Sequence, residues 1–157
     1  MDEKLEGSLE YFTRQQRSTQ WGTFLAALAS EFGQQIPVAE LRVLMSRLGK
    51  SMAETLPIPV GNTVADLEKS MNVIWFDMNW GWVNLIERNT GLFVEHYAAP
   101  LQGAFGKQAL AWSPAILEAI YAHWFVAMGT GSELQLTQLE LEQPDAMHIV
   151  FRFGRSA

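Results

Sequence analysis

The chain has 157 residues, of which 48% are hydrophobic, and a formal net charge of −6 at pH 7. This size suits one domain with its own hydrophobic core. The acidic charge, without a cluster of Lys and Arg, argues against nucleic acid or anionic lipid as a partner, and the absence of Cys excludes disulfides, thiolate catalysis and Cys-ligated zinc.

The N-terminal segment, residues 1–17, is polar and charged, with a few apolar side chains at helical spacing. We expect it to form a short helix or a flexible arm outside a single domain of residues 18–157. Ser18 or Thr19 can cap the next helix, because a hydroxyl accepts a hydrogen bond from a free N–H group at a helix start. We expect that helix to end at Gly33.

Two further helices are predicted before the middle of the chain. Pro37 is typical of a first helical turn, and the helix that follows runs to about Glu54. Asn62 or Thr63 caps the next helix, and residues 79–81 end it.

A β-hairpin is predicted next, with residues 82–87 and 92–98 as strands. Residues 88–91 between them contain Asn and Gly, which tolerate the positive φ of a tight turn. If residues 87 and 92 oppose each other, the pairs are Trp82 with Tyr97 and Ile86 with Phe93 on one face, and Leu85 with Val94 on the other. Both faces then carry large apolar groups, whereas a sheet exposed to water on one side alternates more cleanly.

The second half of the chain contains the most apolar helix. We expect residues 99–112 to form a loop and Ser113-Pro114 to start a helix over residues 115–128. That helix is apolar almost all round, which is typical of a helix buried on several sides. We expect it and the two-faced sheet to pack against other subunits.

A second hairpin is predicted from residues 133–142 and 147–153, turned by residues 143–146. A change of phase among the leucines of its first strand indicates a bulge near Gln138. The order of elements is αααββαββ, which predicts an α+β fold with N-terminal helices, an antiparallel sheet of two hairpins and one buried helix.

No residue pattern typical of catalysis or metal binding is present. The histidines are His96, His123 and His148. Their spacing matches no metal site, and they are better explained by structural roles. A glycoside hydrolase needs two carboxylates across a sugar cleft, and the available acids, Glu87, Glu95 and Glu118, are better explained as solvated or ion-paired groups. We therefore predict that the chain is not an enzyme and binds no metal and no cofactor.

One polar stretch has the composition of a sugar-binding segment. Amides and hydroxyls both donate to and accept from sugar hydroxyls, and an aromatic side chain can cover the apolar face of the ring. The alternative is a solvated arm with a helix cap. The residues are Gln15, Gln16, Arg17, Ser18, Thr19, Gln20 and Trp21.

Large aromatic residues gather around the first hairpin and the last helix. Core packing is one explanation, and a subunit interface, where Trp and Tyr are enriched, is the other. The interface candidates are Trp80, Trp82, Tyr97, Trp112, Tyr121 and Trp124.

Two segments resemble a known family. Asn79-Trp80-Gly81-Trp82-Val83 joins the third helix to the first strand, and Trp112-Ser113-Pro114, followed by Leu117-Glu118, Tyr121 and Trp124, opens the buried helix. Together they resemble the D subunit of bacterial cellulose synthase, and the similarity extends from Phe24 to Phe153.

The resemblance implies a non-catalytic accessory subunit of cellulose synthase. Members of that family form a ring-like octamer, a tetramer of dimers, which supports the production of ordered cellulose. Glucan chains are proposed to run through passages lined by the N-terminal segments, and the passage segment aligns with residues 15–21 here. The resemblance thus implies homo-oligomers, β-1,4-glucan and other synthase subunits as partners. This sequence carries extra residues before the family's usual beginning.

The location of the protein is expected to be the cytoplasm, beside the inner-membrane synthase complex. The first residues contain no apolar segment typical of a secretory signal, and the most apolar run is too short to cross a bilayer. We expect contact with the membrane only through a partner.

Two other functions fit parts of the sequence. The order of elements also looks like the vinyl-reductase-type sensor and transport-particle family, in which an apolar interior encloses a small molecule or acyl chain. A glucan hydrolase is the third hypothesis, and it requires a pair of carboxylates across a groove.

Overall fold

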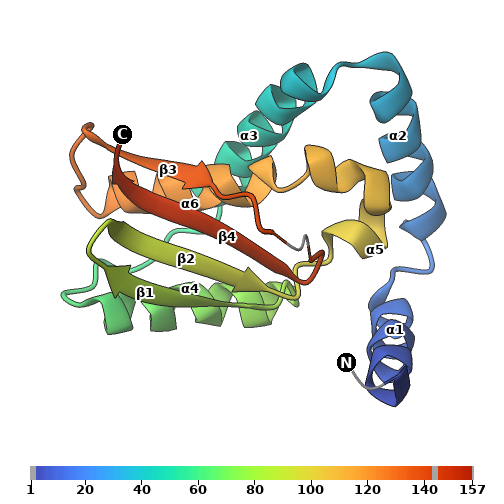
Figure 1. Ribbon diagram of the computed structural model, residues 1–157, viewed down its shortest axis with the longest axis horizontal. Coiled ribbons are helices and arrows are strands. Elements are labelled where there is room, and N and C mark those ends of the chain that lie inside the picture. The colour runs from blue at the N-terminus through green and yellow to red at the C-terminus, as the bar shows by residue number, and fades with distance from the viewer. Residues whose placement is uncertain (1–2, 143–144, 157) are drawn as a thin grey trace.

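A computed structural model describes residues 3–142 and 145–156 and confirms the predicted α+β class (Figure 1). One sheet contains all four strands in the spatial order β1-β2-β4-β3, each antiparallel to its neighbours. The strands are β1 (Trp82–Arg88), β2 (Gly91–Tyr97), β3 (Leu134–Gln138) and β4 (His148–Arg155).

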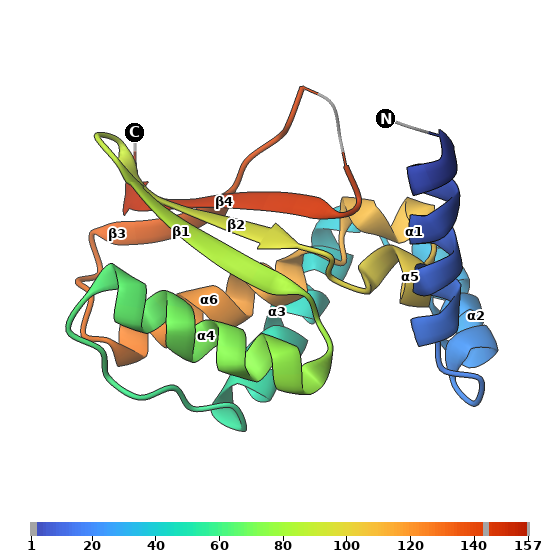
Figure 2. The same cartoon turned by 90° about the horizontal axis from the view of Figure 1, so that it is seen from below.

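The helices form two groups. On one face of the sheet lie α4 (Val64–Met78) and α6 (Ala115–Ala127), with α3 (Val38–Glu54) packed against α6 (Figure 2). The second group lies beyond the end of the sheet. It contains α1 (Glu3–Gln16), α2 (Gly22–Gln35), α5 (Leu101–Phe105) and a short 3-10 helix, η1 (Lys107–Ala111). Among the described residues, no helix has the length and apolarity needed to span a bilayer.

The start and stop signals are confirmed in part. Thr63 Oγ1 accepts the Asp66 N–H at 3.0 Å, and Asn79 ends α4 in the left-handed conformation with φ of 57°. The prediction that Gly33 ends α2 is wrong. The helix continues to Gln35, because it is Pro37 that forces the residue before it into extended backbone.

The first hairpin has the predicted register, with Trp82 opposite Tyr97, Ile86 opposite Phe93 and Leu85 opposite Val94. Leu85 and Val94 face the helices and are buried. The other two pairs lie on the face that no helix covers (Figure 2). The prediction of apolar groups on both faces is therefore confirmed.

The outer edge of β1 is closed by the side chains of α4. Asn72 accepts the Val83 N–H at 2.8 Å and donates to the Val83 carbonyl at 2.9 Å. One turn earlier on α4, Glu68 accepts the Leu85 N–H at 2.7 Å. An edge strand with its N–H and C=O groups taken up in this way cannot readily pair with a strand of another chain.

Two predictions for the second half are wrong. Residues 99–112 are not a plain loop but contain α5 and η1, anchored by the buried side chains of Leu101 and Ala109. The first strand of the second hairpin stops at Gln138 and has no bulge there. The N–H of Leu139 still bonds to the Val150 carbonyl of β4 at 2.9 Å, and the N–H of Gln138, which points away from β4, is taken up by Glu118 at 3.1 Å. Of the predicted turn at residues 143–146, the first two residues lie outside the described ones.

Helix α6 is buried on several sides, as predicted, but by its own chain. It lies between the sheet and α3, and its residues from Ile116 to Phe125 supply much of the core. The expectation that other subunits cover this helix is therefore wrong. Gly49 of α3 lies so close to the carbonyl of Ile116 that a Cβ would overlap it and crowd Ala119.

The substitution Gly49→Ala should therefore destabilise the fold. The methyl group would push α3 away from α6, and overpacking of this kind costs about 1–3 kcal/mol. Urea unfolding followed by circular dichroism measures the change. The matched control is Gly33→Ala in α2, where no atom lies within 4 Å of the added methyl. Its higher helix propensity should leave stability unchanged or raise it by up to about 1 kcal/mol. Equal stability of both variants would refute the close-approach explanation.

Candidate functional site

The predicted sugar-binding segment consists of the last two residues of α1 and the connection from α1 to α2. Ser18 Oγ accepts the Trp21 N–H at 3.1 Å, and the Ser18 carbonyl accepts the Gly22 N–H at 2.9 Å, so the turn before α2 is well formed. Arg17 folds its side chain over Gly22, so a Cβ there would require the Arg17 side chain to move. The N-cap residue of α2 is Trp21, and the helix has no side-chain cap hydrogen bond, so the predicted cap at Ser18 or Thr19 is wrong; Ser18 instead closes the turn before the helix.

The remaining side chains of this segment are free of the protein. Gln15, Gln16, Thr19 and Gln20 are exposed, and no side-chain hydrogen bond joins them to another described residue. Their amides and hydroxyls are thus available to an external ligand. Trp21, at the end of the segment, is 57% exposed.

Exposed aromatic rings are concentrated on both sides of this segment. Among the described residues, four of the six exposed aromatic side chains belong to α1, to the N-cap of α2 or to its first turn. They form two edge-to-face pairs, Tyr11 with Phe12 and Trp21 with Phe24, at centroid distances of 5.8 and 5.7 Å. Such rings are costly to leave in water and are typical of contact surfaces.

Helix α1 has an apolar stripe that the rest of the chain does not cover. Leu5, Leu9 and Phe12 recur at helical spacing and are all exposed, and α1 has no buried residue. A helix of 14 residues is marginal on its own in water. This helix therefore gains stability from any surface that covers its stripe.

Three of the predicted interface residues lie in the core instead. Trp112, Tyr121 and Trp124 are only 4%, 0% and 1% exposed, so they offer no surface to a second copy. For Tyr121 and Trp124 the reason is that α3 and the sheet enclose α6 within one chain, whereas Trp112, at the end of η1, lies beside α2 and Leu41. Trp124 is held in addition by a hydrogen bond from its indole N–H to the Leu56 carbonyl at 2.8 Å.

Trp82 and Tyr97 remain interface candidates, on the uncovered face of the sheet. Their rings are stacked at 5.4 Å, and Tyr97 stacks in turn on His148 at 4.5 Å. Glu95 joins this row, since it accepts the Tyr97 hydroxyl at 3.1 Å and lies 3.8 Å from His148 Nε2. Burial and the neighbouring Glu95 raise the pKa of Tyr97 above 10.

The next row on this face extends the apolar surface. Ile86 and Phe93 are half-buried opposite each other, and the guanidinium of Arg88 lies 4.9 Å from the centre of the Phe93 ring. Trp, Tyr, Phe and Arg are the residues enriched in protein interfaces. We name the surface formed by Trp82, Ile86, Phe93 and Tyr97 the open sheet face.

Trp80 is half-buried and is tied to a polar network in the core. Its carbonyl accepts a hydrogen bond from His96 Nε2 at 2.7 Å, and His96 Nδ1 lies 2.6 Å from the Tyr121 hydroxyl. Because a carbonyl only accepts, the His96 proton is on Nε2 and Tyr121 donates to Nδ1. Burial lowers the pKa of His96 to about 4, although the bond to Trp80 partly opposes this shift.

Two of the carboxylates considered for hydrolysis, Glu95 and Glu118, make structural contacts. Glu118 is 3.5 Å from Arg42 and accepts the Gln138 N–H, whereas Glu95 lies on the opposite face of the sheet from α6. These two carboxylates therefore do not flank one cleft, as hydrolysis requires. Within the described part of the chain, no group of three or more His, Asp or Glu side chains could hold a metal ion.

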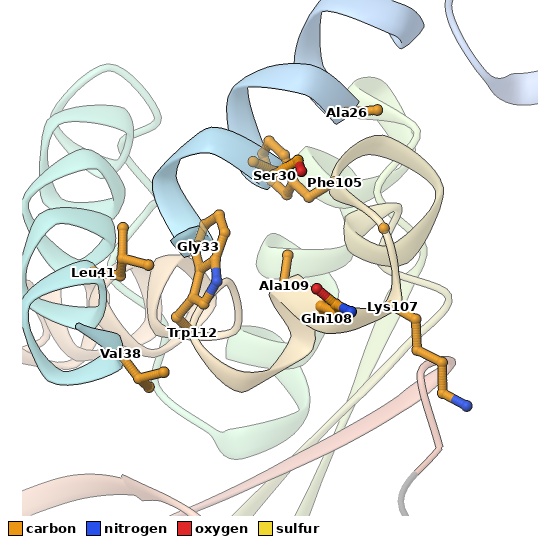
Figure 3. Close-up of a pocket in the computed structure, with 12 residues that line it drawn as sticks. Ala26, Ser30, Gly33, Val38, Leu41, Phe105, Lys107, Gln108, Ala109 and Trp112 are labelled. Carbon is orange, nitrogen blue, oxygen red and sulfur yellow. The ribbon is translucent and has the colours of Figure 1, made fainter. Parts of the chain in front are cut away.

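A groove that the sequence did not predict lies between α2, α5 and η1 (Figure 3). Small residues of α2 form one wall, and Phe105 and Trp112 contribute aromatic rings. The signal in the sequence is the spacing of Ala26, Ser30 and Gly33, which places small side chains on one face of α2. This spacing could have been noticed, but only the fold shows what faces it.

The chain is similar in sequence to known proteins. The family model of the cellulose synthase D subunit matches residues 7–154. Among curated proteins, the cellulose synthase operon protein D of Komagataeibacter xylinus is 28% identical over 106 residues, covering 66% of this chain and 68% of the relative. The protein of the same name from Komagataeibacter sucrofermentans has the same identity and coverage, and another from Komagataeibacter xylinus is 26% identical over 103 residues.

The buried His96 predicts how stability depends on pH. The unfolded chain binds a proton at this residue near pH 6.5 and the folded chain only near pH 4. The contribution of His96 to the free energy of unfolding is therefore complete above pH 6.5. As the pH falls from 6.5 to 4, the free energy of unfolding decreases by up to about 3 kcal/mol. Urea unfolding across this range tests it. In His96→Phe the slope over this range should be smaller, whereas the control His123→Gln should keep it. An unchanged slope in His96→Phe would contradict the assignment.

Proposed function

Because the chain belongs to the family of cellulose synthase D subunits, we propose that it is a non-catalytic accessory subunit that self-assembles and guides nascent β-1,4-glucan chains. The proposal divides the chain into an arm, residues 1–17, and an α+β domain, residues 18–157. The domain assembles with other copies, and the connection at residues 15–21 contacts glucan.

The observation that carries the glucan contact is the unoccupied polar segment between α1 and α2. Exposed amides and hydroxyls that no described residue uses can exchange hydrogen bonds with sugar hydroxyls. Trp21 adds an aromatic face, which suits the apolar side of a pyranose ring. Single hydrogen bonds contribute only about 0.5–1.5 kcal/mol each, so such contacts would let a moving polymer pass.

Self-assembly is supported by the apolar surface that one copy leaves exposed. The open sheet face and the stripe of α1 lie on different parts of the molecule (Figure 2). Two separate contact surfaces are what a closed assembly of dimers requires, because one surface forms the dimer and the other joins the dimers. The proposal is an octamer, a tetramer of dimers, with residues 15–21 facing an inner passage.

An accessory role beside the inner-membrane synthase completes the proposal, with the cytoplasm as the compartment and other synthase subunits as partners. The carboxylates Glu95 and Glu118 are separated by the sheet, which favours this role over a glucan hydrolase. A sensor that encloses its ligand has less support. The interior between α6 and the sheet is filled by packed rings, such as Tyr121 against Phe151 and Phe125 against Phe153.

The glucan contact is tested by replacing Gln15, Gln16 and Gln20 together with alanine. In a cellulose-producing strain that lacks its own family member, this variant should assemble normally but support several-fold less ordered cellulose, because the amides that contact the chain are lost. Yield and X-ray crystallinity measure the outcome.

The control is the double variant Gln34→Ala and Gln35→Ala, at the other end of α2. These amides are also exposed but lie away from residues 15–21, so cellulose production should stay at the wild-type level. If the triple variant produces as much ordered cellulose as the wild type, residues 15–21 do not line a glucan passage. If the triple variant fails to assemble, the segment has a structural role instead.

The open sheet face is tested with Trp82→Glu. An interfacial Trp often contributes about 2 kcal/mol or more, so the dimer should weaken by about 30-fold or more. Sedimentation velocity at micromolar concentration measures the mass. Phe76→Glu is the control, because Phe76 is 70% exposed on the outer side of α4, away from this face. A monomeric wild-type chain would defeat self-assembly altogether, and an unaffected Trp82→Glu assembly would exclude this face.

A further inference from the structure

Both edges of the sheet offer little free backbone to a strand of a second copy. The outer edge of β1 is occupied by two side chains of α4. The other edge strand, β3, has only five residues, and the N–H groups at both of its ends are taken. Leu134 donates to the Gly131 carbonyl at 3.2 Å, and Gln138 donates to Glu118 at 3.1 Å. Because addition of a strand needs a free edge, the sheets of two copies can meet only face to face.

The side chains on the helix-free side of the sheet, which carries the open sheet face, form rows across the strands. Neighbouring rows are about 7 Å apart, because every second residue of a strand points to the same side. From one end of the sheet to the other, the rows contain Trp82 and Tyr97, then Asn84 and Glu95, then Ile86, Phe93 and Arg152, and finally Arg88.

Charge is divided along these rows. Arg88 and Arg152 lie in the last two rows, near the turn between β1 and β2, whereas Glu95 lies in the second row. At the end of the sheet where β4 begins, the described parts of the connection from β3 to β4 rise on this same side (Figure 2). They carry the exposed Glu140 and Glu142. One end of this side is therefore basic and the other end acidic.

Glu95 needs a cation if a second copy covers it. Its side chain is only 18% exposed and accepts the Tyr97 hydroxyl at 3.1 Å. Among the described residues, its one basic neighbour within 4 Å is His148, at 3.8 Å. A carboxylate that loses its remaining water in an interface is costly unless a charged donor pairs with it.

The positions of these charges select one orientation of two copies. If equal rows faced each other, Glu95 would meet the partner's Glu95. A two-fold axis across the strands, midway between the second and third rows, instead brings Glu95 to the partner's Arg152. The guanidinium of Arg152 donates to the Thr90 and Arg155 carbonyls in its own chain, and its further N–H groups remain for a carboxylate.

We propose that two copies pack their open sheet faces together about a two-fold axis that runs across the strands. Glu95 then pairs with the partner's Arg152, and Trp82 lies against the partner's Arg88, as a cation–π contact favours. Each of these contacts occurs twice, because a two-fold interface is reciprocal. The proposal rests on the proposed self-assembly and adds to it the orientation of the copies and the ion pair that fixes it.

The test uses two full-length variants, Glu95→Arg and Arg152→Glu. Each variant alone brings like charges together twice and should weaken the dimer by about a hundredfold. When the two variants are mixed, both pairs again join opposite charges, so the mixture should regain the wild-type mass in sedimentation velocity. The control is Glu87→Arg, which reverses an exposed charge on the other face of β1 and should sediment like the wild type.

Recovery on mixing supports the proposal, because mixing cannot repair damage within one chain. If Glu95→Arg alone assembles more tightly than the wild type, equal rows face each other and the proposed orientation is wrong. If both variants sediment like the wild type, or if the mixture does not recover, the ion pair is wrong. The proposed self-assembly is judged separately, since Trp82→Glu shows whether the open sheet face is a contact at all.

Discussion

The structure depends on one packing arrangement, the enclosure of α6 between α3 and the sheet. Trp75 of α4 is at its centre, with ring centroids 4.9 Å from His96, 5.2 Å from Trp124 and 5.6 Å from Tyr121. The same rings carry the buried hydrogen bonds that fix Trp80 and His96. Each fully buried aromatic side chain contributes several kcal/mol, so this cluster fixes how helices and sheet sit together.

The packing around α6 determines which apolar side chains stay exposed and available for contacts with other molecules. The core uses the rings of α6, and α4 closes the edge of β1 with Asn72 and Glu68. The exposed apolar groups are left on the open sheet face and on the N-terminal helices. In the proposed function, assembly and glucan contact use this periphery and leave the packing around Trp75 undisturbed.

Much of the fold could be predicted from local signals. Thr63 and Asn79 mark the ends of α4, and the Asn-containing turn sets the register that pairs Trp82 with Tyr97. The wrong prediction at Gly33 has a local cause, since Pro37 sets the end of α2. The wrong prediction of a loop at residues 99–112 has a tertiary cause, since Leu101 and Ala109 are buried in the core that distant elements form. For the candidate site, the polar residues 15–21 were found from composition alone, whereas the groove was not.

The sequence by itself determined the class of fold, the family resemblance and the free polar segment before α2. These rest on periodicity, turn residues and side-chain chemistry, which neighbours along the chain define. Only the tertiary structure decided which aromatic residues are core and which are surface. Both Trp82 and Trp112 were predicted as interface candidates, yet one is 42% and the other 4% exposed. Burial depends on which elements meet in space: Trp112 lies beside α2 and Leu41 from far earlier in the chain, whereas Trp82 stacks only on Tyr97 of its own hairpin.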